Sequence, residues 1–156
     1  MADYDDKSEA QSVLACPFAV VTATPTPVSI DLFDFGSCNF EMFAGAGGIT
    51  FTGSNKIEFK VEESEDGTTW NNAADDALIL DPGATAPGGT GIARALIAAK
   101  GAADTVIPTV GYRGKKRYAR CTPVFSGTHG VGTLVGVIAR RAFAYHKPVG
   151  ASAIEV

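Results

Sequence analysis

One short stretch, Asn55–Trp70 with the sequence NKIEFKVEESEDGTTW, constrains the fold of this chain most strongly. Its first half alternates between apolar residues (Ile57, Phe59, Val61) and charged residues (Lys56, Glu58, Lys60, Glu62). A period of two is typical of a β-strand with one face in the core and the other in water. The pair Asp66-Gly67 then suits a tight turn with positive φ. The stretch therefore predicts a strand and a turn of an antiparallel sheet.

Glycine and proline divide the rest of the chain into short segments, since 18 of its 156 residues are Gly and 8 are Pro. Many short strands joined by turns have this composition. Further strands are expected within residues 18–23, 28–35, 38–53 (with a bend at 45–48), 105–110, 116–125 and 132–146. For residues 92–100 a short helix and a strand remain equally open. The loop before them, Asp81–Gly91, is expected to be exposed.

This strand pattern predicts an all-β fold, a single jelly-roll-like β-sandwich that spans residues 17–147. Residues 1–16 begin with a polar, acidic sequence and are expected to form an N-terminal arm. Residues 148–156 are expected to form a C-terminal tail. The length, with 46% hydrophobic and 19% charged residues, fits one folded core.

The sequence predicts a protein made in a cytosol, without membrane contact. No apolar run reaches the roughly 18 residues of a membrane span, and the start, MADYDDKSEA, is acidic where a signal peptide is basic. The three cysteines, Cys16, Cys38 and Cys121, are widely spaced and odd in number, which argues against a disulfide framework or a zinc knuckle. We expect buried, inert thiols, with Cys16 the most accessible of them.

Charge is distributed unevenly along the chain. Residues 1–111 carry 5 basic and 16 acidic side chains, a balance of −11, whereas residues 112–156 carry 8 basic and 1 acidic side chain, a balance of +7. The basic segment Tyr112–Arg120 could belong to a nucleic-acid surface. We favour acidic and basic strands that lie side by side in one sheet and neutralise each other. The pI near 5.1 supports this interpretation and predicts no nucleic-acid partner.

Residues suited to catalysis or metal binding are sparse. The only histidines, His129 and His146, have no cluster of Cys or carboxylates beside them. A GxSxG elbow is absent, and GAGG, GGTG and GYRGKK lack the spacing of dinucleotide- or phosphate-binding loops. A calcium loop centred on Gly67 would need a chelating Glu at position 73, which is Ala73. The sequence therefore predicts no enzyme, no cofactor and no metal site.

Trp70 is the single tryptophan of the chain. An exposed Trp beside a turn could stack on a sugar ring, as in a carbohydrate-binding module. We expect instead that Trp70 anchors the core or covers its edge with its large apolar area.

Three segments, YDDKSEAQSV, FKVEESEDGTTW and GYRGKKRYARC in this order, resemble a family of small head proteins of tailed bacteriophages and phage-like gene transfer agents. The resemblance implies a structural virion protein on the outer capsid surface, made in the host cytoplasm. It would act as a head-decoration (cement) protein or as the base of a head spike. Its partners would be the major capsid protein and copies of itself, as a trimer or pentamer. The resemblance implies no catalytic residues.

Two other classes of function remain open at this stage. The first is a carbohydrate- or receptor-binding phage module, which an exposed Trp70 beside other coplanar aromatics would favour. The second is a small enzyme or an unrelated cytosolic domain, which His129 and His146 converging on a carboxylate in a pocket would favour.

Two sets of contact residues are expected if the protein assembles on a capsid. Tyr4, Val13 and Leu14 are apolar residues in an otherwise polar arm and are predicted to contact the capsid or an adjacent subunit. Arg117 and Arg120 are predicted at an oligomer interface, because the opposite charge of the two chain portions would let copies join acidic surface to basic surface.

Overall fold

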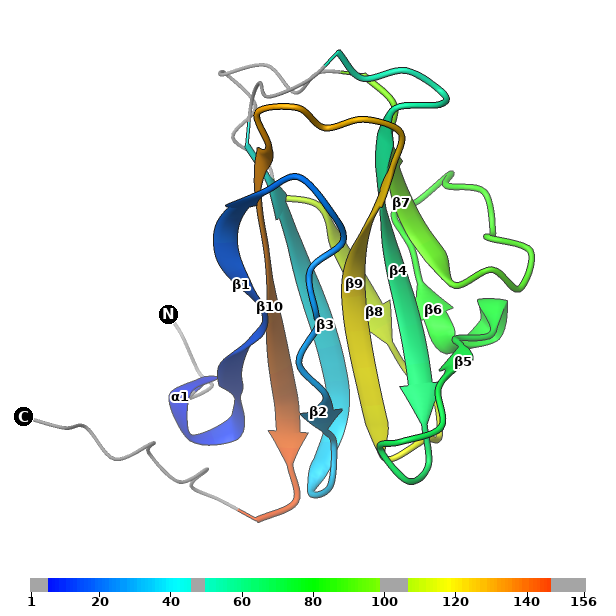
Figure 1. Cartoon of the computed structure of the whole chain (residues 1–156). Helices are drawn as coiled ribbons and strands as arrows, with labels where there is room; N and C mark the ends of the chain where they lie inside the picture. Colours follow the sequence, from blue (N-terminus) through cyan, green and yellow to red (C-terminus); the bar gives the residue numbers. More distant parts are fainter. Residues whose placement is uncertain (1–5, 46–49, 99–106, 147–156) are drawn as a thin grey trace, which may run out of the picture.

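The computed structural model describes residues 6–45, 50–98 and 107–146 (Figure 1). These residues form two antiparallel β-sheets, one short α-helix and one 3-10 turn, Asp75–Ala77. The helix is α1 (Asp6–Glu9), and the strands are β1 (Gln11–Val21), β2 (Ile30–Asp31), β3 (Phe35–Ala44), β4 (Lys56–Ser64), β5 (Asn71–Asn72), β6 (Leu78–Ile79), β7 (Ile92–Leu96), β8 (Thr109–Tyr112), β9 (Tyr118–Ser126) and β10 (Thr133–Ala144). Within the described ranges, no helix is both long and apolar enough to cross a bilayer.

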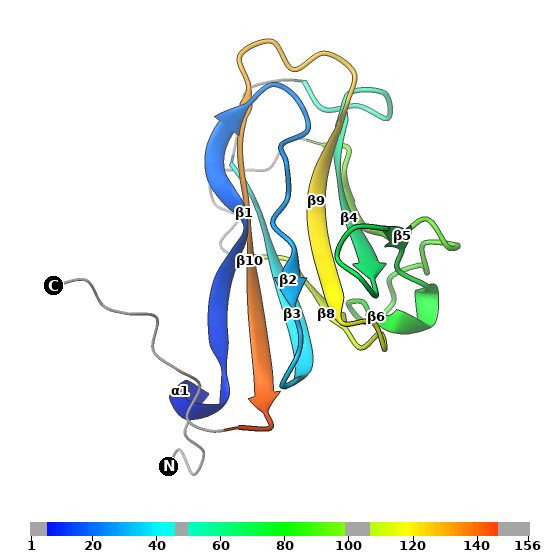
Figure 2. The same cartoon turned by 60° about the horizontal axis from the view of Figure 1, so that its bottom comes forward.

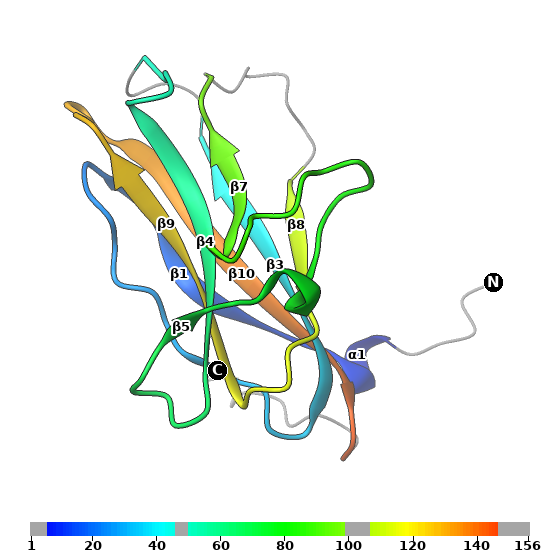
Figure 3. The same ribbon diagram turned by 90° about the vertical axis from the view of Figure 1, so that its right-hand side faces the viewer.

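The strand order confirms the expected jelly-roll-like sandwich. Sheet A has the order β1-β10-β3-β8-β6, and sheet B has the order β2-β9-β4-β5, with β7 also paired to β4. The chain alternates between the sheets from β1 to β4, adds the short β5 to sheet B and the short β6 to sheet A, returns to sheet B for β7, and alternates again from β8 to β10. This is the double Greek-key path of a jelly roll. Figure 3 shows the two sheets lying face to face.

The period of two in Lys56–Glu62 corresponds, as predicted, to a strand with one face in the core. Ile57, Phe59 and Val61 are at most 1% exposed, on the inner face of β4. They meet the inward side chains of sheet A, among them Phe40 and Val137, in one continuous core. The predicted turn is also present, because Gly67 has a φ of 73°.

The expected boundary between an arm and the sandwich at residue 16 is wrong, because β1 begins at Gln11 and pairs with β10 along its length. Ala15 and Cys16 are fully buried, so this part of the chain belongs to the core. Cys16 is therefore not the accessible cysteine that we expected. A chain starting at Pro17 would lose half of an edge strand and would not fold unchanged.

The sequence left a short helix and a strand equally open for residues 92–100, and the structure has a strand there. Ile92–Leu96 forms β7, which pairs with β4. The preceding loop, Asp81–Gly91, is largely exposed, as predicted. It is nevertheless tied down, because the carboxylate of Asp75 accepts hydrogen bonds from the backbone N–H groups of Gly88 and Gly89, at 3.1 and 2.9 Å.

Other boundaries shift by a few residues. The segment 28–35 contributes only the two-residue β2, and β8 runs Thr109–Tyr112 rather than 105–110. The predicted bend at 45–48 and the tail 148–156 lie mostly or wholly outside the described residues.

Several turns and α1 gather at one end of the sandwich, below the strands in Figures 1 and 2, which we call the lower end. It holds the β2–β3, β4–β5 and β8–β9 connections.

Candidate functional site

Part of the outer face of sheet A is apolar, whereas Glu41, opposite Ile138, and Asn39, opposite Arg140, make another part of it polar. Successive residues of a strand point to opposite faces, so Leu134 and Ile138 of β10 face outward while Val135 and Val137 face the core. The pairing register extends this outer row onto β1 and β3. The resulting apolar face consists of Leu14, Phe18, Val20, Phe43, Leu134 and Ile138.

Much of the apolar face is open to solvent. Leu14, Phe18, Val20 and Leu134 are 50%, 45%, 65% and 37% exposed. Isolated exposed apolar residues are ordinary, but a contiguous patch on one face marks an interaction site more often. No element of the described chain covers this face: β1, β10 and β3 lie at the surface on that side (Figure 1).

Gly136 leaves space for an aromatic ring at the centre of the apolar face. The ring of Phe18 lies across β10 at Gly136, where an added Cβ would stand 2.5 Å from a ring carbon. Because Gly136 has no side chain, the Phe18 ring reaches toward Phe43 of β3, with a centroid distance of 5.5 Å. The two rings, tilted by 54° to each other, form an aromatic ridge across three strands, the kind of apolar surface that interfaces use.

The outer face of sheet B is ionic instead. Lys56 pairs with Glu58 at 2.6 Å, and Glu62 pairs with both Lys60 at 3.1 Å and Arg120 at 2.8 Å. Glu62 and Arg120 are direct neighbours across β4 and β9. The predicted neutralisation between acidic and basic strands is therefore present at one cross-strand pair, Glu62 with Arg120, while the other two pairs lie within β4.

Trp70 covers the edge of this ionic face. Its ring is half-buried, and the guanidinium of Arg120 lies over it at 4.2 Å from the centroid. Such a cation–π contact fixes the ring and shields one side of it. Among the described residues no aromatic ring stacks beside Trp70, so the geometry that would favour a sugar platform is not found there.

The turn after β4 is held by Asp66. Its carboxylate accepts hydrogen bonds from the backbone N–H groups of Thr69 and Thr68, at 2.7 and 2.8 Å, and from the hydroxyl of Ser64 at 2.9 Å. These bonds, that from Thr69 foremost, hold the pKa of Asp66 well below its ordinary value. The acidic residue of this stretch is thus explained by the turn itself.

The predicted contact residues lie in different places. Leu14 belongs to the apolar face, whereas Val13 on the same strand is half-buried against the core. Tyr4 lies outside the described residues. Of the three, the structure therefore places Leu14 where a partner could reach it.

Arg117 and Arg120 both have partners within the chain. Arg117 donates two hydrogen bonds to the carboxylate of Asp31, at 3.1 and 2.7 Å, and lies over the rings of Phe33 and Tyr118. The bond from Arg117 lowers the pKa of Asp31 below its ordinary value. An interface through Arg117 or Arg120 would have to compete with these contacts, and their role in an oligomer stays a prediction.

The two histidines lie at opposite ends of β10. His129 is buried against Phe125 and shares a 2.8 Å hydrogen bond between Nε2 and the carbonyl oxygen of Ser126. His146 is exposed, with Nδ1 3.0 Å from Asp34. They do not converge on one carboxylate. Across residues 6–45, 50–98 and 107–146, no three His, Cys, Asp or Glu side chains gather in a metal-binding arrangement.

The cysteines are buried thiols, as predicted for Cys38 and Cys121. Burial raises the pKa of the Cys38 thiol to about 12, and it also raises the pKa values of Cys121 and Cys16. Since the thiolate is the reactive form, these groups behave as small apolar core residues.

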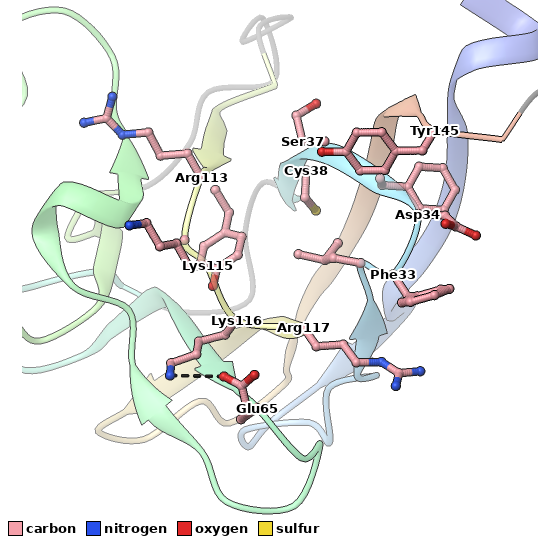
Figure 4. A pocket seen from close by; sticks show the side chains of 15 residues that line it. Phe33, Asp34, Ser37, Cys38, Glu65, Arg113, Lys115, Lys116, Arg117 and Tyr145 are labelled. Carbon is pink, nitrogen blue, oxygen red and sulfur yellow. Dashed lines mark ion pairs between the residues drawn. The ribbon is translucent and has the colours of Figure 1, made fainter.

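A pocket of about 460 Å³ opens at the lower end. One wall is the β8–β9 connection, Arg113–Arg117, which we call the basic turn; the other includes Phe33, Asp34 and Tyr145 (Figure 4). Four of the five residues of the basic turn are cationic, and all four are exposed. The sequence indicated this segment by its charge, but not its position beside a pocket.

The apolar face was not predicted from the sequence, although a signal for it is present. The run Leu134–Ile138 is apolar throughout, and in an antiparallel sheet this indicates a strand that is apolar on both faces.

Comparison with known proteins adds no relative: no protein-family model, curated protein or solved structure matches the chain. Since jelly rolls occur in capsid proteins, lectins and cupins alike, a function has to be argued from the surfaces.

Proposed function

We propose that this protein is a structural virion protein that attaches to the outer surface of a phage capsid as a head-decoration (cement) protein. The observation that carries the proposal is the contrast between the two outer faces of the sandwich. Sheet B presents paired charges to water, whereas sheet A presents the apolar face. A protein that binds a preformed surface on one side and faces solvent on the other needs this asymmetry.

The partner is the major capsid protein. The sequence resemblance to small phage head proteins supports this choice, and attachment of this kind requires no catalytic group. The aromatic ridge of Phe18 and Phe43 supplies an anchor. Burying a fully exposed large apolar side chain contributes about 1.5–3 kcal/mol. The four most exposed side chains of the apolar face are 37–65% exposed, so each would contribute roughly half of this toward the entropy lost on association.

Two charges placed on the apolar face should weaken attachment. We expect Leu14→Glu combined with Val20→Glu to weaken binding to particles that lack the native protein by at least roughly tenfold. Each carboxylate would have to lose its water without a partner, which costs roughly 1–3 kcal/mol or more, and about 1.4 kcal/mol corresponds to a factor of ten. Bound protein is measured by co-sedimentation with the particles.

The matched control is Ile97→Glu, since Ile97 is 57% exposed but follows β7 in sheet B. It should decorate particles as the parent does, and all variants should keep the circular dichroism spectrum of the parent. If the Leu14→Glu, Val20→Glu variant coats the particles as fully as the Ile97→Glu control, the apolar face is not the attachment surface.

A further inference from the structure

We propose that the basic turn, Arg113–Arg117, binds the acidic N-terminal segment of a second copy of this chain, residues 2–6 with the sequence ADYDD. This association takes place in solution and at the lower end of the sandwich. It involves neither the apolar face nor a capsid, so it stands or falls independently of the proposed function.

The backbone of the basic turn is held firmly in place. The backbone N–H of Arg113 donates to the carbonyl oxygen of Ala77 at 2.9 Å, and its Nε donates to the carbonyl oxygen of Asp76 at 2.8 Å. Gly114 passes so close to Tyr112 that an added Cβ would stand 2.2 Å from the Tyr112 hydroxyl oxygen. That hydroxyl in turn donates to Glu63 at 2.8 Å. The cationic side chains therefore project from a fixed loop, which lowers the entropic cost of binding.

Two of the four cations are already neutralised within the chain. Lys116 pairs with Glu65 at 3.1 Å, and Arg117 pairs with Asp31 at 2.7 Å. Arg113 and Lys115 have no carboxylate within 4.0 Å among the residues that the structure describes. Figure 4 shows their side chains extending to the same side of the turn. They form an uncompensated pair of positive charges on the surface of a chain with an acidic pI.

The surroundings of the turn suit a peptide with isolated carboxylates and an aromatic side chain. Phe33 and Tyr145 lie on the opposite wall of the pocket, on the other side of the turn from the ends of the Arg113 and Lys115 side chains (Figure 4), and are 65% and 75% exposed. A peptide that crosses the turn can pack an aromatic ring against them. Asp34 and Glu65 also line the pocket. A continuous polyanion such as nucleic acid would meet these two carboxylates, whereas a short peptide can place its charges against Arg113 and Lys115 alone.

The N-terminal segment has this chemistry. It carries Asp3, Asp5 and Asp6 around Tyr4. It leads into α1, which lies at the same lower end as the basic turn (Figures 1 and 2). Two copies that approach through their lower ends can each offer the segment to the other, so the contact can form twice in a symmetric pair.

Reversing the free charges should dissociate the oligomer. In sedimentation equilibrium of the full chain at low salt, we expect Lys115→Glu with Arg113→Glu to weaken association roughly tenfold or more, because like charges would then face each other. Salt at about 0.5 M should weaken association of the parent in the same direction. The matched control is Arg94→Glu, an exposed cation on β7 whose nearest carboxylate, that of Asp81, is 3.7 Å away; association should stay unchanged.

A charge swap then identifies the partner segment. Asp3→Lys with Asp5→Lys should weaken association as much as Arg113→Glu with Lys115→Glu does. A variant that combines all four substitutions should associate again, because opposite charges would face each other once more. The proposal is overturned if the parent is monomeric across the concentration range, or if Arg113→Glu with Lys115→Glu leaves association unaffected. It is also overturned if the variant with all four substitutions stays dissociated.

Discussion

Replacing Phe59 with alanine is expected to lower the free energy of unfolding by about 3–5 kcal/mol, as for other large aromatic side chains removed from a core. Phe59 is 1% exposed at the centre of β4, and its neighbours along the strand, Ile57 and Val61, are equally buried. The side chains around it come from both sheets, so they cannot all move to fill the space. Urea denaturation followed by circular dichroism measures the change.

Glu58→Ala is the control for this substitution. Glu58 adjoins Phe59 on the same strand but points outward and pairs with Lys56. The pair lies at the sheet surface with 28% and 15% of its side chains exposed. Surface ion pairs contribute about 0–1 kcal/mol, so a loss well below that of Phe59→Ala is expected. A loss below about 1 kcal/mol for Phe59→Ala would instead place Phe59 outside the core and contradict the assignment of the two faces of β4.

Replacing Gly91 with alanine should cost about 2–5 kcal/mol. Gly91 has a φ of 72°, and a Cβ there would stand 2.4 Å from the carbonyl oxygen of Val61. That oxygen accepts a hydrogen bond from Ala73, and the Val61 N–H donates to Gly91. The left-handed backbone costs an L-residue roughly 1–2 kcal/mol, and displacing packed backbone adds roughly 1–3 kcal/mol.

Gly83→Ala separates these two contributions. Gly83 has a similar φ of 84°, but nothing lies within 4 Å of an added Cβ. Only the backbone cost, about 1–2 kcal/mol, is expected there. Equal losses for the two variants, again from urea denaturation, would show that the close approach of Gly91 to β4 is not a constraint.

The parts of the fold that were predictable from the sequence are those with a local signal. The alternation through Lys56–Glu62 identifies both the strand and its buried face, because a period of two assigns each side chain to one side. The Asp66-Gly67 turn follows from residues that adopt its backbone conformation readily. The charge pattern likewise anticipated that β4 and β9 neutralise each other.

The start of the sandwich was not predictable in this way. The strand β1 is interrupted by shifts of register around Cys16, and it contains Pro17, so its residues do not alternate. Its identity as a strand comes from pairing with β10, more than 100 residues away along the chain. The segment Ile92–Leu96 was ambiguous for a related reason: its composition suits a helix, and pairing with β4 decides for a strand.

The candidate site depends still more on pairing. Leu14 was predicted as a contact residue from its apolar character, but three of the other five residues of the apolar face, Phe43, Leu134 and Ile138, come from β3 and β10. The contact of Phe18 with Phe43 exists because the register places Gly136 between them. A single sequence does not show such a register. By contrast, Arg117 and Arg120 stood out by charge, and the fold supplies each of them with an internal partner.

The central claim, attachment of the sandwich to a capsid through the outer face of sheet A, is tested most directly by cryo-electron microscopy of phage particles with and without this protein. We expect additional density on the outer surface of the decorated shell that fits the jelly roll. In that density β1, β10 and β3 should face the capsid, with Leu14, Phe18 and Val20 buried at the contact and the paired charges of sheet B facing solvent. Maps without such density, or with the apolar face turned toward solvent, would contradict the account.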